Sequence, residues 1–140
     1  MPRTVSLLLV AIAAAFLVGR VSAQPAAKEE TRVFEIRTYT ANEGKLDDLN
    51  ARFRDHTTKL FEKHGMTNVG YWVPLDEPRS KDTLIYVLAH ESREAAKKSW
   101  EAFGKDPEWQ KVRAASEENG RLVAKVESVY VAPTDYSPMK

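Results

Sequence analysis

The chain has 140 residues, a formal net charge of +1 and no cysteine. Its acidic and basic residues are balanced and form no basic block, which argues against nucleic acid or an anionic membrane surface as a partner. The lack of cysteine excludes thiol catalysis, cysteine-bound metals and disulfides, so stability has to come from packing or assembly.

The first 23 residues predict a secretory signal peptide. Arg3 precedes an apolar run over residues 5–18, and the small residues of 21–23 fit a cleavage site. The run has about 14 residues, fewer than the roughly 20 of a spanning helix, so an uncleaved anchor is the weaker alternative. We expect cleavage after Ala23, a secreted or periplasmic location, and no membrane association after cleavage. Residues 24–31 are expected to be a disordered lead-in.

The rest of the chain is long enough for one domain, which we place at residues 32–132, with a tail at 133–140. Residues 33–40 alternate with a period of two, which predicts a strand. We expect one face of this strand, with Phe34 and Ile36, to meet the helices. The opposite face carries Glu35, Arg37 and Tyr39.

Residues 45–64 predict a helix, because their apolar residues recur at helical spacing. Gly65 stands where a helix C′ residue belongs. A strand is expected at 67–75, with Tyr71 and Trp72 on opposite faces. Residues 82–90 predict a further strand; its apolar middle shows no alternation, which is typical of a strand covered on both faces.

Two more helices and a last strand complete the predicted domain. Ser92 is the expected N-cap of a helix over 93–103. Asp106 followed by Pro107 predicts the start of another helix, which ends near Gly120. The closing strand is expected at residues 122–131.

The order β-α-β-β-α-(α)-β predicts an α+β, ferredoxin-like fold with a four-stranded antiparallel sheet. Helices would cover one face of that sheet and leave the other bare. Exposing a whole apolar face is unfavourable, so we expect a homodimer that pairs sheet against sheet.

Four segments together resemble the NIPSNAP family: FEIRTYT, RFRDHTTKLFEKHGMTNVGYW, KDPEWQKV and APTDYSP. The resemblance spans about residues 32–138 and implies a ferredoxin-like domain that dimerises into an α+β barrel. It implies no established reaction. Animal members are mitochondrial and are discussed as protein-interaction and signalling factors. The secretory signal and single domain of this chain depart from that pattern, so a mitochondrial role is not carried over.

The histidines are the first candidates for chemistry. His56 and His64 lie about 12 Å apart along the predicted helix axis, too far to share a metal. We predict no metal site, and expect both to pack at the helix–sheet boundary with one nitrogen hydrogen-bonded.

A second candidate is a ligand pocket inside the barrel, formed by aromatic residues and a few polar groups. Its expected residues are Arg37, Tyr39, Trp72, Tyr86 and His90. The alternative is that Glu35, Arg37, Lys125 and Glu127 form cross-strand ion pairs at the dimer interface. Trp100 and Trp109 are expected to be packing residues.

Two classes of function remain open. Since no catalytic constellation is recognisable, we expect a dimeric module that binds a protein partner or a small apolar ligand, without a cofactor. The alternative, by analogy with other dimeric α+β barrels, is a cofactor-free monooxygenase or a haem-binding enzyme. His56 or His64 would then accept a proton, or one histidine would ligate haem, while Arg37 and Trp72 line the pocket.

Overall fold

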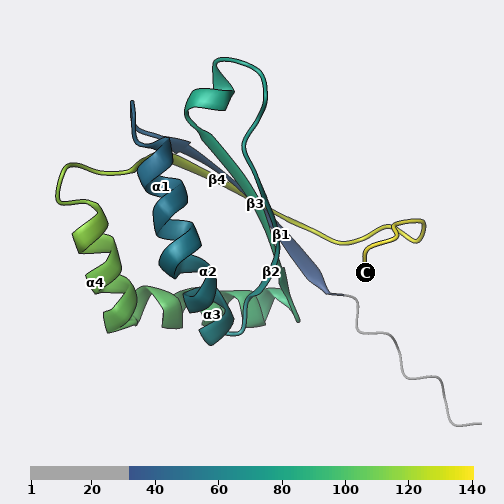
Figure 1. The fold of residues 1–140 in the computed structure, drawn as a ribbon. Helices are drawn as coiled ribbons and strands as arrows, with labels where there is room; N and C mark the ends of the chain where they lie inside the picture. The colour runs from purple at the N-terminus through teal and green to yellow at the C-terminus, as the bar shows by residue number, and fades with distance from the viewer. Residues whose placement is uncertain (1–31) are drawn as a thin grey trace, which may run out of the picture.

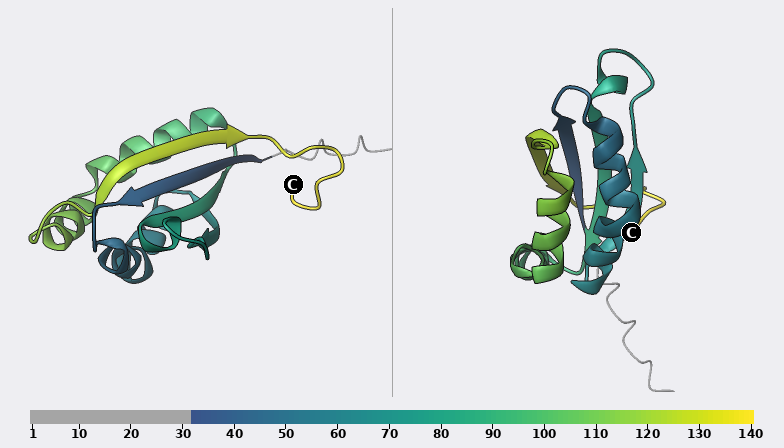
Figure 2. Two further views of the ribbon diagram at one scale, coloured as in Figure 1. Left: turned by 90° about the horizontal axis from the view of Figure 1, so that it is seen from above. Right: turned by 60° about the vertical axis from the view of Figure 1, so that its left-hand side comes forward.

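The computed structural model describes residues 32–140, and the predicted signal peptide and lead-in lie outside this range. The strands are β1 (Val33–Ala41), β2 (Thr67–Trp72), β3 (Thr83–His90) and β4 (Val123–Val131). They form one antiparallel sheet in the order β2-β3-β1-β4. Helices cover one face of it (Figures 1 and 2). The predicted α+β, ferredoxin-like fold is confirmed. No helix in this part of the chain is long and apolar enough to cross a membrane.

The first helical segment is one rod with an irregular middle. It consists of α1 (Leu46–Arg52), the π-helical turn η1 (Phe53–Thr57) and α2 (Thr58–Lys63). A π turn inserts one residue into the helical repeat, and such turns are frequent at functional sites. Here the Thr57 hydroxyl donates to the Arg52 carbonyl over 3.2 Å. The sequence predicted a helix over this range but not the π turn.

Gly65 ends this rod as predicted. Its φ is +77°, and its N–H donates to the carbonyl of Glu62, while the N–H of Met66 donates to that of Phe61. These two bonds make a Schellman motif, which glycine favours because a left-handed conformation costs it little. The chain then enters β2 directly.

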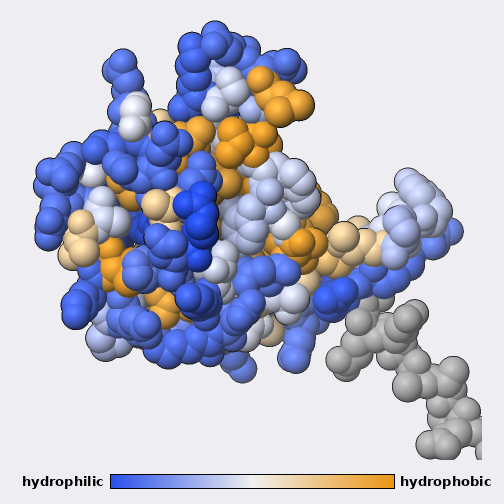
Figure 3. All heavy atoms as spheres, viewed as in Figure 1, coloured by the Kyte–Doolittle hydropathy of each residue, from blue (hydrophilic) through white to orange (hydrophobic). Residues whose placement is uncertain are grey.

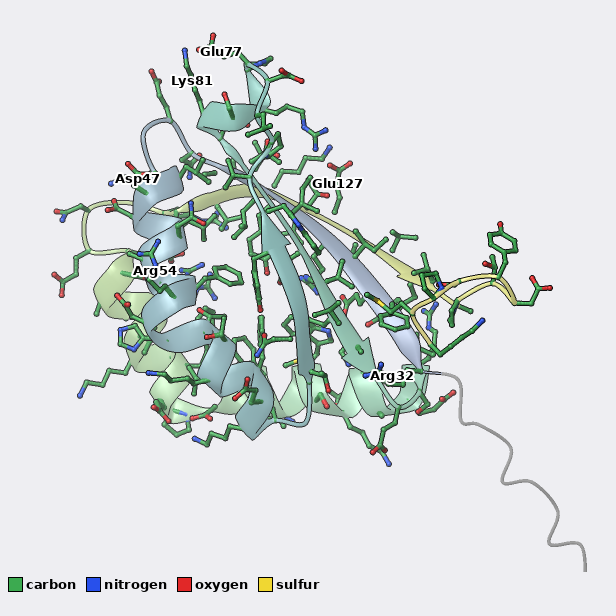
Figure 4. All side chains as sticks on the ribbon, turned by 45° about the vertical axis from the view of Figure 1, so that its right-hand side comes forward. Arg32, Asp47, Arg54, Glu77, Lys81 and Glu127 are labelled. Carbon is green, nitrogen blue, oxygen red and sulfur yellow. The ribbon has the colours of Figure 1, made fainter. Side chains whose placement is uncertain are left out.

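The remaining helices begin at the predicted caps. Ser92 accepts the N–H of Ala95 and starts α3 (Arg93–Lys105). Asp106 accepts the N–H of Glu108 and starts α4 (Pro107–Ser116). No residue of α4 is buried, so this helix packs on the surface of the domain. A short 3-10 helix, η2 (Arg79–Lys81), lies in the β2–β3 loop, where Lys81 pairs with Glu77 at its tip (Figure 4).

The core lies between the sheet and the helices and is largely aromatic. Phe53 and Phe61 of the first rod pack against Tyr86 of β3, with ring centroids 5.1 and 5.9 Å away. Phe103 of α3 packs on Phe61 and on Trp109 of α4. In the view of Figure 3 the helices present a largely hydrophilic surface.

The structure reverses the predicted orientation of β1. Its Glu35, Arg37 and Tyr39 face the helices, while Phe34 and Ile36 lie on the bare face beside Val87 and Val131. Alternation defines which residues share a face, but not which face meets the helices. Glu35 is only 1 % exposed, because donors from other elements surround its carboxylate.

The bare face is apolar towards the tail and carries the Lys125–Glu127 pair at its other end, and residues of this chain cover it in part. On β3, Tyr86 and Leu88 are buried towards the helices, whereas Ile85 and Val87 remain half-buried on the bare side. Trp72 of β2 is 54 % exposed. The predicted cover on both faces of β3 is therefore complete only on the helix side; on the bare side the strand ends at Thr83 and Ala89 are buried, but its middle is not. The tail after β4 runs beyond the end of the sheet (Figure 1), where Arg32 donates to the carbonyl of Lys140.

Candidate functional site

The carboxylate of Glu35 is the centre of a buried polar cluster beneath α3. Its Oε1 accepts from Nη1 of Arg37 at 2.8 Å and from the Ser128 hydroxyl at 2.7 Å. Its Oε2 accepts from Nε1 of Trp100 at 2.8 Å and lies 2.9 Å from Nε2 of His90. We call these five residues the Glu35 cluster. It connects β1, β3, β4 and α3 through one carboxylate.

This environment keeps Glu35 ionised. Burial alone would raise the pKa of its carboxyl, but hydrogen bonds from His90, Trp100 and Ser128, together with the charge of Arg37, lower it to about 2. An ionised carboxylate only accepts hydrogen bonds, so Nε2 of His90 carries the proton that points to it. The second ring nitrogen, Nδ1, is buried and has no partner among the described residues.

Arg37 is largely buried and has the ion-pair partner that a buried guanidinium requires. It pairs with Glu35 of the same strand, and its Cζ lies 4.2 Å from the centre of the Trp100 ring. Burial alone would lower the pKa of Arg37, but the oxygens of Tyr86 and Tyr39 and the Glu35 carboxylate raise it above its ordinary value. The cation is therefore held between a carboxylate and an aromatic face.

Four of the five predicted pocket residues lie on the helix side of the sheet. Tyr86 donates to the Tyr39 hydroxyl at 3.0 Å, next to Arg37, and His90 lies in the Glu35 cluster. Trp72 is separated from them because it pairs with Ile85 on the bare face. Its indole rests over Gly70, where any side chain would collide with it.

The predicted cross-strand ion pairs are also distributed differently. Lys125 and Glu127 pair at 3.0 Å, but both belong to the exposed part of β4 (Glu127 in Figure 4). Glu35 and Arg37 pair within one strand on the opposite side of the sheet. The two pairs are therefore independent.

The two helix histidines have different surroundings. Nε2 of His64 lies 2.7 Å from Oδ2 of Asp106, which links the end of α2 to the junction of α3 and α4. The expectation of one hydrogen-bonded nitrogen is confirmed for His64. It is wrong for His56, which is exposed in the π turn and faces α4 rather than the sheet. The side chains proposed for an oxygenase thus lie apart: Arg37 beneath α3, Trp72 on the bare face and His56 on the surface. The other proposed proton acceptor, His64, lies at the end of α2 and is bonded to Asp106.

Within residues 32–140 no three histidine or acidic side chains are grouped closely enough to hold a metal ion. The Glu35 cluster presents a carboxylate whose lone pairs are already taken by four protein donors. In this arrangement the carboxylate fixes the tautomer of His90 and the orientation of Arg37. It works as a polar anchor between the sheet and α3.

Sequence reasoning missed Ser128 and the polar role of Trp100. Ser128 lies opposite Arg37 in the β1–β4 register, but it is one small residue in a strand, and nothing local marks it. Trp100 was predicted as a packing residue, and its ring does pack on Phe61 and Phe103. Only the fold shows that its N–H also reaches Glu35.

A sequence profile of the NIPSNAP family matches residues 34–138. The chain belongs to the NIPSNAP family. Except for Val33, this match covers the four strands and the three main helical segments, together with most of the tail, so the family resemblance of the sequence is confirmed. No match was found among curated proteins.

Solved structures agree with the family assignment. A NIPSNAP family protein of unknown function from Agrobacterium tumefaciens is 19 % identical; the alignment covers 80 % of this chain and 96 % of that one, with a TM-score of 0.68. An uncharacterised NIPSNAP-like domain protein from Burkholderia xenovorans is 16 % identical, with 78 % and 90 % covered and a TM-score of 0.65. At these identities the likeness shows a shared NIPSNAP fold.

The fold extends beyond NIPSNAP proteins. A Streptomyces coelicolor monooxygenase, ActVA-Orf6, solved with the ligand nanaomycin D, is 15 % identical and has a TM-score of 0.55. The alignment covers 79 % of this chain and 95 % of the monooxygenase. NIPSNAP domains therefore share their architecture with an enzyme, which by itself assigns no reaction to this chain.

Proposed function

We propose that this NIPSNAP domain is exported and works as a homodimeric binding module for a small apolar ligand. The observation that carries the proposal is the apolar part of the bare sheet face, where Ile36, Val87 and Val129 are neighbours across β1, β3 and β4 and Trp72 of β2 lies beside Ile85. An exposed apolar face of this kind is typical of an interaction surface. A second copy is the occupant we propose, because a two-fold dimer brings the same patch of both chains together and would cover both apolar faces at once.

The bare face also favours a ligand near the tail. A cavity of about 340 Å³ lies between the tail and the ends of β1, β3 and β4. Phe34, Ile36, Val87 and Met139 line it, and no charged side chain does. Its volume falls within the range of small-molecule sites, roughly 300–1,000 Å³. An apolar lining without charge favours an apolar ligand over a charged one.

The Glu35 cluster favours a binding module over an enzyme, because it offers no free catalytic group. The cluster's carboxylate is saturated by protein donors, and its histidine and arginine are fixed by it. The likeness to a monooxygenase supports the enzyme alternative by fold only, and the residues suggested for that chemistry are separated in this chain. The structure thus favours a rigid scaffold whose bare sheet face is open for binding.

Two valines of β4 provide a matched test of the dimer. Val129 is 52 % exposed on the bare face, and Val126 is 44 % exposed on the other side of the same strand. In native mass spectrometry the wild-type chain should be a dimer, Val129→Lys a monomer, and Val126→Lys still a dimer. A wild-type monomer, or equal effects of the two lysines, would refute pairing through this face.

The same spectra test the ligand. A dimer that carries a defined extra mass, lost on extraction into organic solvent, supports a small apolar ligand. A dimer that is bare, and that does not enhance the fluorescence of an apolar naphthylamine probe, would refute the ligand and leave a protein partner as the occupant.

A further inference from the structure

A second candidate site lies on the helices, away from the bare face. The groove between the first helical rod and α4 encloses about 610 Å³. One wall is the stripe of α1 and η1 that contains Arg52 and Asp55, and the other is the stripe of α4 that contains Lys111. Figures 1 and 2 show the two helices side by side. The π turn thus forms part of the wall.

Arg52 is the unusual residue of this groove. It is 6 % exposed, yet its five N–H donors are poorly used. Nη1 makes only long contacts, 3.3 Å to the Ser116 hydroxyl and 3.4 Å to Glu117. Nε is buried without a partner, and Nη2 makes no hydrogen bond within residues 32–140.

The residues around Arg52 support its charged guanidinium but leave some of its N–H donors without an acceptor. Its Cζ lies 5.1 Å from the centre of the Trp109 ring, which supports one face of the guanidinium. Burial lowers the pKa of Arg52, and the charge of Glu117 offsets this only in part. Nη2 has no partner in the described part of the chain and, unlike Nε, is not fully enclosed, so the Nη1–Nη2 edge of the guanidinium is suited to a carboxylate, which accepts two parallel N–H bonds.

Two further charges in the groove have no ion-pair partner in the described part of the chain, Lys111 and Asp55. Asp55 lies one helical turn after Arg52 on the same rod. The groove therefore offers cations for a carboxylate and a nearby anion for an ammonium group. Between them lie small apolar side chains, Ala51, Val112 and Ala115.

From this arrangement we propose that the α1–α4 groove binds a zwitterionic ligand of the amino-acid or short-peptide class, with its carboxylate on Arg52 and its ammonium group at Asp55. The apolar residues between the walls accept an aliphatic side chain. Three acidic residues line the groove, Asp48, Asp55 and Glu108, and they disfavour a phosphate or another multiply charged anion. The site is separate from the proposed dimer face and extends the binding role of the module.

Nuclear magnetic resonance titration of the full chain tests this with four probes. L-leucine carries both charged groups, 4-methylpentanoate only the carboxylate, isopentylamine only the amine, and leucyl-leucine is the peptide arm. Leucine should shift backbone amides of residues 48–56 and 108–119 with a Kd of about 1 mM. It should bind up to about fivefold more tightly than 4-methylpentanoate, the range of one exposed ion pair, while isopentylamine should not shift these amides. Tighter binding of leucyl-leucine than of leucine identifies a peptide ligand; the reverse order identifies a free amino acid.

Two variants assign the contacts. Arg52→Gln should weaken leucine binding about tenfold or more, the effect of losing charge-assisted hydrogen bonds. Asp55→Asn should remove the advantage of leucine over 4-methylpentanoate. Arg54→Gln and Asp47→Asn are matched controls, because these exposed residues of the same rod do not line the groove (Figure 4). Both controls should leave binding unchanged.

Several outcomes would overturn the site. One is no amide shift in the groove with either leucine or leucyl-leucine at about 10 mM, a concentration that would detect even millimolar affinity. Another is an unchanged affinity in folded Arg52→Gln. If Arg52→Gln does not fold, Asp55→Asn still decides the case, because Asp55 is exposed. A dimer that fails to bind these probes defeats this site alone, and a monomer that binds them defeats only the proposed pairing.

Discussion

Nε2 of His90 lies 2.9 Å from Oε2 of Glu35, although 55 positions separate the two residues, and each side chain is only about 1 % exposed. Trp100 donates to the same oxygen, and Ser128 to the other one. One charged residue of β1 is therefore the meeting point of three other elements. Its removal should affect the whole domain rather than one strand.

Glu35→Gln should lower the free energy of unfolding by about 3 kcal/mol, because it leaves the largely buried cation of Arg37 without its counter-charge. Urea unfolding followed by tryptophan fluorescence measures this. Glu101→Gln is the control, since Glu101 is exposed on α3, and it should change stability by less than about 0.5 kcal/mol. Similar losses of unfolding free energy in both variants would mean that the Glu35 cluster contributes no more than an exposed charge.

The pKa of Glu35 predicts how stability depends on pH. In the unfolded chain its carboxyl takes up a proton near pH 4.5, whereas in the folded protein it stays ionised to about pH 2. Its contribution is therefore complete above pH 4.5 and is lost as the pH falls through this window, by about 3 kcal/mol in all. The stability difference between wild type and Glu35→Gln should accordingly shrink from about pH 5 downwards in chemical denaturation. A difference that is constant with pH would contradict the lowered pKa.

Asp106 allows its two roles to be separated. Oδ1 caps α4, while Oδ2 lies 2.8 Å from Nζ of Lys63 and 2.7 Å from Nε2 of His64. These partners lower the pKa of Asp106 well below its ordinary range. Asp106→Asn keeps a capping oxygen and loses the charge, whereas Asp106→Ala loses both. In thermal unfolding followed by circular dichroism, the Tm should fall in the order wild type, Asn, Ala; equal values for Asn and Ala would show that the cap contributes nothing.

Gly65→Ala should destabilise the domain by about 1–2 kcal/mol, because a left-handed backbone conformation is unfavourable for alanine. An added methyl group would meet only the Ser99 hydroxyl at 3.8 Å, so the effect comes from the backbone alone. Gly104→Ala in α3 has open space around it and should stabilise by about 0.5–1 kcal/mol. Chemical unfolding of the two variants should therefore give changes of opposite sign.

The sequence predicted the elements well because their signals are local. The caps at Ser92 and Asp106 and the stop at Gly65 each depend on residues within one turn. The orientation of β1 could not be read in the same way. It depends on Trp100 and Ser128, which lie 65 and 93 positions from Glu35 and reach it only in the folded sheet.

The candidate sites show the same limit. The sequence analysis selected Arg37 and His90, because polar residues in an apolar strand stand out, but it placed them in a barrel interior together with Trp72. The groove at Arg52 gave no signal, because a lone arginine in a charged helix is ordinary. Only its burial and its unused donors distinguish it from exposed Arg54, two positions along the chain.

The absence of buried residues in α4 has a dynamic consequence. The packing of this helix is concentrated at its first turn, where Trp109 packs 4.6 Å from the Phe103 ring centre and Asp106 provides the cap. Its end is joined to the first rod through the long contacts of Arg52 with Ser116 and Glu117. Its backbone amides should therefore exchange with deuterated solvent sooner than those of β1 and β3, because local opening requires little loss of packing. Since α4 is also one wall of the groove, a molecule that bridges both walls would slow this exchange, and the protection would spread from the ligand contacts to the end of the helix at Ser116.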